Sequence, residues 1–388
     1  MHRVLVLGSG KIGSLISGLL AGSGDYEVDL ADSRPGAARE VATAHGLPAI
    51  RPLDLDATDR QALERHAAAH GIGALVSALP YHCNQGVAEA ARATDCHYFD
   101  LTEDLSVAAT VQRVAAGAAT AFAPQCGLAP GFVSIAAAEL IRHFASLRTV
   151  KLRVGALPQH PNNVLKYSLT WSTDGLINEY GNPCIAVVDQ QQREVLPLEG
   201  REEIEIDGQL YEAFNTSGGL GSLAASFGAQ VESMDYKTIR YPGHCAQMHL
   251  LMSGLKLNQD RATLKRILEN AVPQTLQDVV IIYVAVTGMQ DGEFREENYV
   301  NKVYPQLIAG RLWSAIQVTT AAGLCAVIDL VFGTPGRFRG FVRQEDLPLA
   351  EVLANRFGRY FDGSSGKDVS LRVVTAGQAG HQRSHGKP

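Results

Sequence analysis

Residues 3–13 read Arg-Val-Leu-Val-Leu-Gly-Ser-Gly-Lys-Ile-Gly, and this stretch decides the fold of the first part of the chain. The apolar run at 3–7 predicts a buried strand. Three glycines follow in the order G-x-G-x-x-G, and apolar residues then recur at helical spacing from Ile12 to Leu20. A strand, a glycine turn and an amphipathic helix in that order are typical of the dinucleotide-binding unit of a Rossmann fold.

Each glycine of the turn has its own role in such a unit. Gly8 permits the tight turn, Gly10 lets a pyrophosphate approach the backbone, and Gly13 lets the helix pack closely on the strand. Free N–H groups at the helix start attract phosphates. A glycine turn without a ligand is the alternative. We predict that a nicotinamide dinucleotide contacts Gly8, Ser9, Gly10, Lys11, Ile12 and Gly13.

An acidic residue follows the second predicted strand, which covers residues 26–31. Asp32 lies 19 residues after Gly13, where a carboxylate can accept both hydroxyl groups of the adenosine ribose. A carboxylate at this place repels a 2′-phosphate and therefore favours NAD. Arg34 follows closely and could accommodate that phosphate, so NADP stays open.

Strands and helices alternate up to residue 124. We expect further strands near 48–53, 74–79, 97–101 and 120–124, and helices at 59–70, 84–93 and 106–116. This alternation predicts an α/β fold with a doubly wound parallel sheet. The strand at 74–79 ends in Ser77-Ala78-Leu79-Pro80, at the sheet edge where such folds bind ligands.

The pattern changes after residue 125. Strand-like stretches at 150–154, 166–172, 186–188, 202–206, 238–241 and 279–287 dominate, with helices at 131–144 and 260–270. They predict an α+β domain with antiparallel strand pairs. We expect a Rossmann domain at 1–125, a substrate and dimerisation domain at 126–320, a segment at 321–375 that packs back on the Rossmann domain, and a disordered tail at 376–388.

Composition excludes several classes of protein. The 388 residues carry a formal net charge of −6 without runs of like charge, which argues against nucleic acid or an anionic membrane as partner. None of the six cysteines has metal-finger spacing, so we expect no metal site and a reduced, cytoplasmic protein. The apolar stretch 321–332 contains Asp329 and is expected to be too short for a membrane span.

Eight strings in the chain resemble the saccharopine dehydrogenase-like family, and most closely its lysine 6-dehydrogenase branch. They are GSGKIG (8–13), SALPYHCN (77–84), YFDLTED (98–104), PQCGLAPGF (124–132), LPQHPNNVLKYSLTWSTDGLINEY (157–180), FNTSGGL (214–220), DYKTIRYPGHC (235–245) and GFVRQED (340–346). The resemblance implies NAD(P)-dependent chemistry at a carbon–nitrogen bond and a homodimer. For the lysine branch it implies oxidative deamination of L-lysine at the ε-carbon, giving ammonia and 2-aminoadipate 6-semialdehyde, which cyclises to a piperideine.

One departure from the broader family favours lysine. Saccharopine reductases carry an arginine where this chain has Asn215-Thr216-Ser217. Saccharopine has three carboxylates and lysine has one, so the absence of this guanidinium fits the smaller substrate. A dehydrogenase for saccharopine or a carboxynorspermidine-type secondary amine, and a non-catalytic NAD-binding protein, are the alternatives.

The candidate site residues combine these arguments with the resemblance. We expect Arg240 to bind the α-carboxylate, Asp100 to hold and deprotonate the ammonium, and His244 to move protons. Each has a plain structural alternative: an ion pair for Arg240, an Asx cap for Asp100 and a core position for His244. Further expected substrate contacts are Thr238, Ser172, Trp171, Tyr81 and Thr216, and further cofactor contacts are Ser77, Leu79, Pro80, Cys126 and Gly127.

Overall fold

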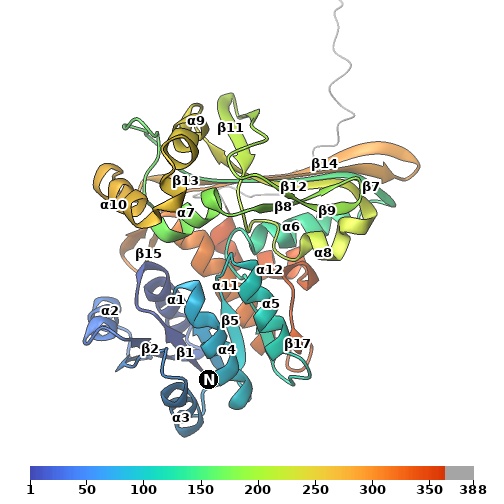
Figure 1. The fold of residues 1–388 in the computed structure, drawn as a ribbon. Coiled ribbons are helices and arrows are strands. Elements are labelled where there is room, and N and C mark those ends of the chain that lie inside the picture. The colour runs from blue at the N-terminus through green and yellow to red at the C-terminus, as the bar shows by residue number, and fades with distance from the viewer. Residues whose placement is uncertain (363–388) are drawn as a thin grey trace, which may run out of the picture.

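The computed structural model describes residues 1–362, which form two β-sheets at opposite ends of the molecule with helices between them (Figure 1). The first sheet is built around strand β1 (His2–Leu7). Val4 and Val6 pack into one core and Leu5 and Leu7 into another, so both faces of the strand are covered. This explains why residues 4–7 are apolar without alternation.

The first sheet is entirely parallel and has the strand order β17-β6-β5-β4-β1-β2-β3. Its other strands are β2 (Tyr26–Asp32), β3 (Ile50–Asp54), β4 (Ala74–Ser77), β5 (His97–Asp100), β6 (Ala121–Ala123) and β17 (Gly340–Phe341). The helices of this half are α1 (Lys11–Gly22), α2 (Ala37–His45), α3 (Arg60–His70), α4 (Asn84–Ala93) and α5 (Leu105–Val114). The predicted doubly wound Rossmann sheet is confirmed.

The second sheet is mixed and has the main order β10-β11-β12-β7-β13-β14. Its strands are β7 (Ser146–Pro158), β10 (Glu202–Ile206), β11 (Gln209–Asn215), β12 (Val231–Arg240), β13 (Asp278–Gln290) and β14 (Glu293–Val303), with β8 (Cys184–Val188) joining β12 to β9 (Gln191–Val195). A separate hairpin joins β15 (Gln306–Ile308) to β16 (Arg311–Trp313). The predicted α+β second half is confirmed.

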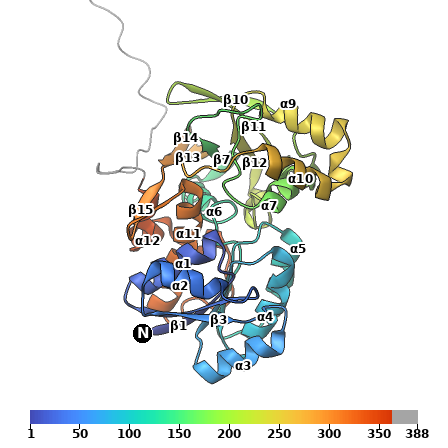
Figure 2. The same ribbon diagram turned by 90° about the vertical axis from the view of Figure 1, so that its left-hand side faces the viewer.

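Two groups of helices accompany the mixed sheet. Helices α6 (Phe132–Ile141) and α11 (Ala315–Gly333) lie between the two sheets, whereas α7 (Thr173–Gly181), α9 (His244–His249) and α10 (Arg261–Ala271) gather at one end of the mixed sheet (Figures 1 and 2). Those three helices share a core of their own that includes Leu176, Met248 and Leu264. The short helices α8 (Leu223–Phe227) and α12 (Leu349–Ala354) complete the set within residues 1–362.

The chain returns to the parallel sheet near its end. Ser314 caps α11, and α11 contacts α1. Strand β17 then pairs in parallel with β6. Both contacts are made by residues of the segment expected at 321–375, of which the structure describes residues up to 362. The remainder of that segment and the tail expected at 376–388 lie outside the described residues.

Two secondary-structure expectations are wrong. Residues 166–172 form no strand: Tyr167 and Leu169 are buried as irregular chain, and Ser172 caps the unforeseen helix α7 by accepting a bond from Gly175 N. The pairing within the mixed sheet is also not antiparallel throughout, because β7 and β12 run parallel. Apolar content predicted burial correctly but did not determine how the backbone is paired.

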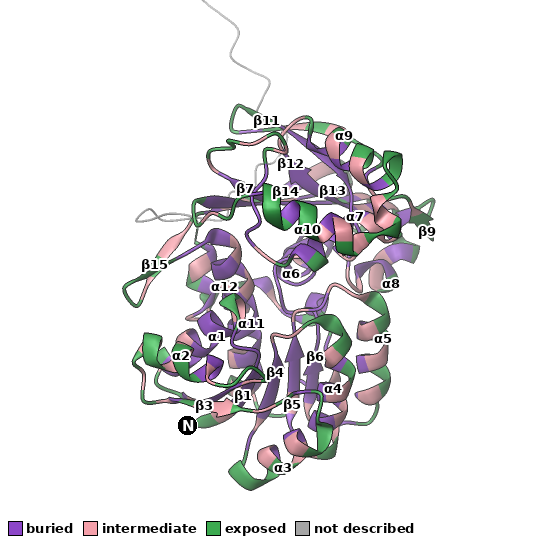
Figure 3. Ribbon diagram, turned by 60° about the vertical axis from the view of Figure 1, so that its left-hand side comes forward, coloured by how far each residue is buried: buried purple, intermediate pink, exposed green. Residues whose placement is uncertain are grey.

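Helix α11 is the one helix of residues 1–362 that is long and apolar enough to cross a membrane. It runs for 19 residues, so the expectation of a run too short to span was wrong. However, 72% of its apolar window is buried inside the structure. A helix apolar on all sides that lies between two sheets is an ordinary core helix. Figure 3 shows that the buried residues concentrate on the strands and on these inner helices.

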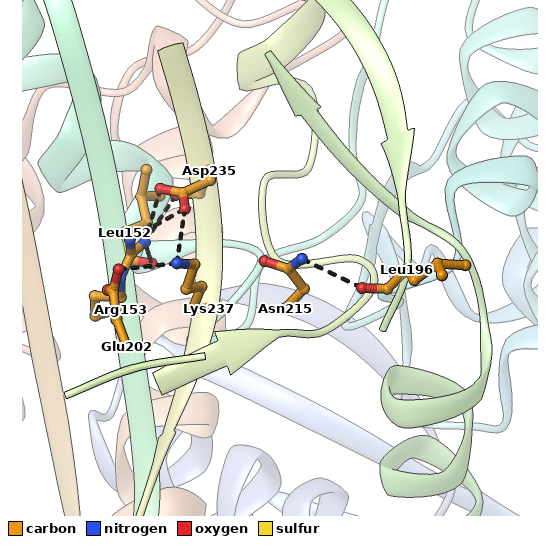
Figure 4. Close-up of polar contacts among 7 residues, drawn as sticks. All are labelled: Leu152, Arg153, Leu196, Glu202, Asn215, Asp235 and Lys237. Atoms are coloured by element: carbon orange, nitrogen blue, oxygen red, sulfur yellow. Dashed lines mark hydrogen bonds and ion pairs between the residues drawn. The ribbon is translucent and has the colours of Figure 1, made fainter. Parts of the chain in front are cut away.

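A cluster of charged side chains lies on the mixed sheet (Figure 4). Arg153 is 1% exposed and donates to Glu202 at 2.5 Å and to Asp235 at 2.9 Å. Lys237 completes the cluster by donating to Glu202 at 2.8 Å. A buried guanidinium needs such partners, so this cluster is a structural part of the sheet.

Candidate active site

A cavity of about 820 Å³ opens between the glycine turn of the parallel sheet and one end of the mixed sheet. The turn and the loops after β4 and β5 form one wall. Residues of β7, α7, β12, the start of α11, the loop at 127–130 and Arg261 of α10 form the rest. Expected cofactor and substrate residues meet here from distant parts of the chain: Gly10, Lys11, Ile12, Gly13, Leu79, Pro80, Tyr81, Gly127, Trp171, Ser172, Thr238 and Arg240.

The glycine turn is shaped to receive a dinucleotide. Gly8 has φ +96°, and a Cβ at Gly13 would lie 1.9 Å from the carbonyl oxygen of Gly8. A Cβ at Gly10 would meet nothing within 4 Å, which leaves open space beside the backbone. No side chain caps the start of α1, so its first N–H groups are available to an anion. These features fit a pyrophosphate.

Asp32 ends β2 next to this turn, and three hydrogen bonds fix the orientation of its carboxylate. One carboxylate oxygen accepts bonds from Ser9 N at 2.9 Å and Ser9 Oγ at 2.6 Å, and the other accepts from Arg34 N at 2.9 Å. Burial opposes ionisation, but these hydrogen bonds outweigh it and hold the pKa of Asp32 below its usual value. The carboxylate is thus ionised and suits ribose hydroxyls. Neither Ser9 nor Asp32 lines the cavity itself.

Arg240 ends β12 and is 3% exposed. Its Nε donates to Tyr180 Oη at 2.7 Å and its Nη1 to the carbonyl of Ile239 at 2.8 Å. Within residues 1–362 no partner accepts from Nη2. Arg240 lines the cavity, so the free part of its guanidinium suits a ligand carboxylate.

Two glutamates that were not among the expected site residues line the same cavity, Glu103 and Glu179. No other residue of the described chain donates a hydrogen bond to either side chain, although Glu179 is only 9% exposed and Glu103 is half-buried. Burial raises the pKa of both, that of Glu179 to about 8, with the charge of Glu103 contributing. Both lie inside strings that carry the family resemblance, and that was the available signal. Carboxyl groups without a salt-bridge partner in residues 1–362 suit an ammonium ligand.

The other expected substrate residues on the wall have structural bonds as well. Ser172 caps α7, and Trp171 Nε1 donates to Tyr167 Oη at 3.1 Å. Thr238 Oγ1 donates to the carbonyl of Val154 at 3.3 Å. Tyr81 is 40% exposed at the cavity. Their aromatic and methyl groups can enclose an aliphatic chain.

Asp100 does not reach the cavity, which corrects the expectation that it binds the substrate ammonium. It is 0% exposed and accepts from Tyr98 Oη at 2.6 Å, Thr102 N at 2.9 Å and Gln125 N at 2.9 Å. Burial raises its pKa above the usual value. Its bond to Thr102 is the Asx-type cap named as the alternative.

His244 is likewise not at the cavity surface. It is 1% exposed, and its ring contacts the Leu165 carbonyl at 2.7 Å and Tyr180 Oη at 3.0 Å. Burial, helped by the charge of Arg240, lowers its pKa to about 3. A buried histidine with so low a pKa, which does not line the cavity, does not fit the predicted proton shuttle.

Three further expected contacts lie inside the protein instead of at the cavity. Ser77 donates to Asn84 Oδ1 at 2.7 Å. Cys126 donates to the Ala123 carbonyl at 3.1 Å, and burial raises the pKa of its thiol, which fits a packing role. Thr216 is 2% exposed, and its hydroxyl has no hydrogen-bond partner among residues 1–362. No group of three metal-ligating side chains occurs in residues 1–362.

Comparison with known families divides the chain into two consecutive parts. Residues 4–126 match the saccharopine dehydrogenase NADP binding domain, and residues 127–359 match the saccharopine dehydrogenase C-terminal domain. The chain belongs to the saccharopine dehydrogenase family. It is therefore an oxidoreductase of the type that acts on a carbon–nitrogen bond with a nicotinamide dinucleotide, and its glycine turn lies within the part of the chain that matches the NADP binding domain.

Solved structures of the same fold agree with this membership. Saccharopine dehydrogenase (L-Glu forming) from Saccharomyces cerevisiae is similar with a TM-score of 0.75 and 17% identity, over 92% of this chain and 98% of that one. Homospermidine synthase from Legionella pneumophila, solved with NAD, has a TM-score of 0.66 and 13% identity, over 94% and 90%. At such identities the likeness shows a common saccharopine dehydrogenase fold.

Proposed function

We propose that this protein catalyses the NAD-dependent oxidative deamination of L-lysine at its ε-carbon. One observation carries the proposal: a single cavity beside the glycine turn is lined by one guanidinium and two carboxyl groups that suit a ligand. The Nη2 of Arg240 has no acceptor within residues 1–362. The half-buried Glu103 and the buried Glu179 receive no hydrogen bond from any other residue of that range. L-Lysine has one carboxylate and two amines, so each of its charged groups has a complementary group in this cavity.

The charges suit larger family substrates less well. Saccharopine has three carboxylates, but the other arginine of the cavity, Arg261, already donates from Nε, Nη1 and Nη2 to three asparagine side chains. Lys11 donates to Gln274 beside the cofactor turn. A polyamine without a carboxylate would leave Arg240 buried and unpaired, which is costly.

The placement of the two carboxylates supports one orientation of lysine. Glu103 follows β5 at the carboxyl edge of the parallel sheet, the side on which the cofactor binds. Glu179 lies on α7, where the charge of Arg240 lowers its pKa against the larger effect of burial. We therefore place the α-ammonium and α-carboxylate at Glu179 and Arg240, and the reacting ε-amine at Glu103.

In this orientation Glu103 is the group that accepts a proton from the ε-ammonium. The neutral amine then has a lone pair that assists loss of hydride from the ε-carbon. When bound, the nicotinamide ring accepts that hydride. Water adds to the resulting substrate imine, and ammonia and the aldehyde leave. Trp171 and Tyr81 enclose the methylene chain and limit the access of water before hydride transfer.

A substrate panel tests the proposal. Purified protein is mixed with NAD or NADP and with L-lysine, saccharopine, carboxynorspermidine or L-ornithine, and the formation of reduced cofactor is followed by absorbance. We expect turnover on L-lysine with NAD. Preferential turnover of saccharopine or carboxynorspermidine would contradict the lysine assignment, and cofactor binding without any turnover would favour a non-catalytic protein. The homodimer and the cytoplasmic location stay predictions.

A further inference from the structure

Arg240 is held in place by side chains that do not line the cavity. Its Nε donates to Tyr180 Oη at 2.7 Å. The same hydroxyl lies 3.0 Å from His244 Nε2, and His244 Nδ1 lies 2.7 Å from the carbonyl oxygen of Leu165. All three side chains are buried. A continuous hydrogen-bonded chain thus runs from the substrate-facing arginine to the backbone.

The direction of every hydrogen bond in this chain follows from chemistry. The Leu165 carbonyl can only accept, so His244 Nδ1 must carry the ring proton. Nε2 of the neutral ring is then an acceptor, and Tyr180 donates its hydroxyl proton to it. This leaves the lone pairs of Tyr180 Oη for Arg240 Nε, a cation that can only donate. Because burial and the charge of Arg240 lower the pKa of His244 to about 3, the ring stays neutral.

Aromatic rings restrict the guanidinium further. The centre of the guanidinium lies 5.0 Å from the ring centroid of Tyr167 and 5.7 Å from that of Tyr180. The rings of Tyr167 and Phe214 lie 5.3 Å and 6.3 Å from that of His244. Within residues 1–362, Nη2 is then the guanidinium nitrogen of Arg240 that has no protein acceptor.

We propose that Tyr180 and His244 are positioning residues, which hold the Arg240 guanidinium so that its Nη2 side meets the carboxylate of the substrate. The inference rests on the proposed function for the identity of that substrate. A preorganised cation loses little conformational entropy when the carboxylate binds. The arrangement selects amines that carry a carboxylate and contributes nothing to a diamine that lacks one.

Two substrates and three variants separate positioning from general structural damage. Pentane-1,5-diamine is L-lysine without its carboxylate. Tyr180→Phe removes the acceptor of Arg240 Nε, and His244→Leu removes both bonds of the imidazole. His244→Gln is the matched control, because its carboxamide offers one acceptor to Tyr180 and one donor to Leu165. We measure kcat and KM for both amines, and the thermal unfolding of each variant.

We expect His244→Leu and Tyr180→Phe to raise KM for L-lysine by about tenfold, the effect of one charged hydrogen bond, with kcat little changed. Kinetics on the diamine should not change, and His244→Gln should behave like the wild type. Equal losses on both amines, or a loss confined to kcat, would overturn the inference.

A different result would show that the proposed function, and not the positioning role, is wrong. If the wild type oxidises neither amine, that function is wrong, and calorimetric titration of the NAD-bound protein with L-lysine then tests the positioning role alone. His244→Leu must bind L-lysine about tenfold more weakly than His244→Gln does. Equal affinities, or no binding to the wild type, would overturn the positioning role as well.

Discussion

Glu103 and Glu179 line one cavity, and the charge of Glu103 raises the pKa of Glu179. Glu103 follows a strand of the parallel sheet, whereas Glu179 lies on helix α7 beside the mixed sheet. No other residue of the range 1–362 donates a hydrogen bond to either carboxyl group. Keeping two such groups in one cavity, one of them buried, costs free energy in the empty protein, and a ligand with two ammonium groups would remove that cost.

The role of Glu103 as proton acceptor predicts a large effect on catalysis. Glu103→Gln cannot take the proton of the ε-ammonium, so we expect kcat on L-lysine to fall by about 10²–10⁴-fold. KM for NAD should not change. Steady-state kinetics check this, with Glu205→Gln, a change at an exposed glutamate, as the control. A fall in kcat of less than about threefold, far below the usual range, would mean that another group accepts the proton.

The raised pKa of Glu179 predicts how stability depends on pH. Its pKa is about 8 in the folded protein against an ordinary 4.5, so between these values the folded state holds a proton that the unfolded chain has lost. The free energy of unfolding of the empty protein should therefore fall as pH rises from 4.5 to 8, by up to about 1.4 kcal/mol per pH unit from this group.

Glu179→Gln removes this contribution, and urea unfolding between pH 5 and pH 9 measures the difference. We expect the variant to lose less stability than the wild type as pH rises, and to be the more stable protein at pH 9. Parallel pH profiles for the two proteins would show that Glu179 ionises normally.

Gly10 and Gly13 form a matched pair for the cofactor turn. A Cβ at position 13 would lie 1.9 Å from the Gly8 carbonyl oxygen, whereas one at position 10 meets open space. Gly13→Ala should therefore destabilise the empty protein by roughly 1–3 kcal/mol. Gly10→Ala should leave thermal stability unchanged but weaken NAD binding, because the methyl group occupies the place of the pyrophosphate. Thermal unfolding measures the stability of both variants, and calorimetric titration with NAD measures their affinity. A Gly10→Ala variant that is less stable than Gly13→Ala, or that binds NAD as tightly as the wild type, would contradict this account of the turn.

Asp32 predicts the coenzyme preference. Its carboxylate is ionised and fixed by Ser9 and Arg34, so it should repel a 2′-phosphate. Asp32→Ala is expected to raise KM for NAD and to increase the ratio of kcat/KM with NADP to that with NAD by about tenfold, or roughly 1.4 kcal/mol. Glu40→Gln removes a neighbouring negative charge and is the control. If the ratio of kcat/KM with NADP to that with NAD does not change in Asp32→Ala, Asp32 is not the residue that discriminates between the two coenzymes.

Local sequence patterns predicted the parts of this protein that depend on local chemistry. The glycine turn required particular residues at adjacent positions, and it is found where the pattern placed it. Asp100 and His244 were chosen by residue type and by their place near strand ends, and both are buried behind the cavity. Whether a side chain points toward a cavity or away from it depends on long-range packing, which a local pattern does not contain.

Glu103 and Glu179 are the opposite case: they line the cavity, but the local sequence did not indicate it. Their neighbours Thr102 and Tyr180 are buried in the protein, and nothing in the adjacent residues distinguishes the two glutamates from other charged positions. They become recognisable only when the loop after β5 and helix α7 meet at one cavity. Arg240 was predicted because a carboxylate-binding arginine is chemically distinctive.

Isotope-labelled substrate tests the central claim most directly. The protein is given NAD and L-lysine with ¹⁵N at either the ε-position or the α-position, and the released ammonia is analysed by mass spectrometry beside the yield of NADH. We predict that ammonia carries ¹⁵N only from ε-labelled lysine, with one NADH formed for each ammonia. Label released from the α-position, or no ammonia from L-lysine while saccharopine is oxidised, would contradict the account.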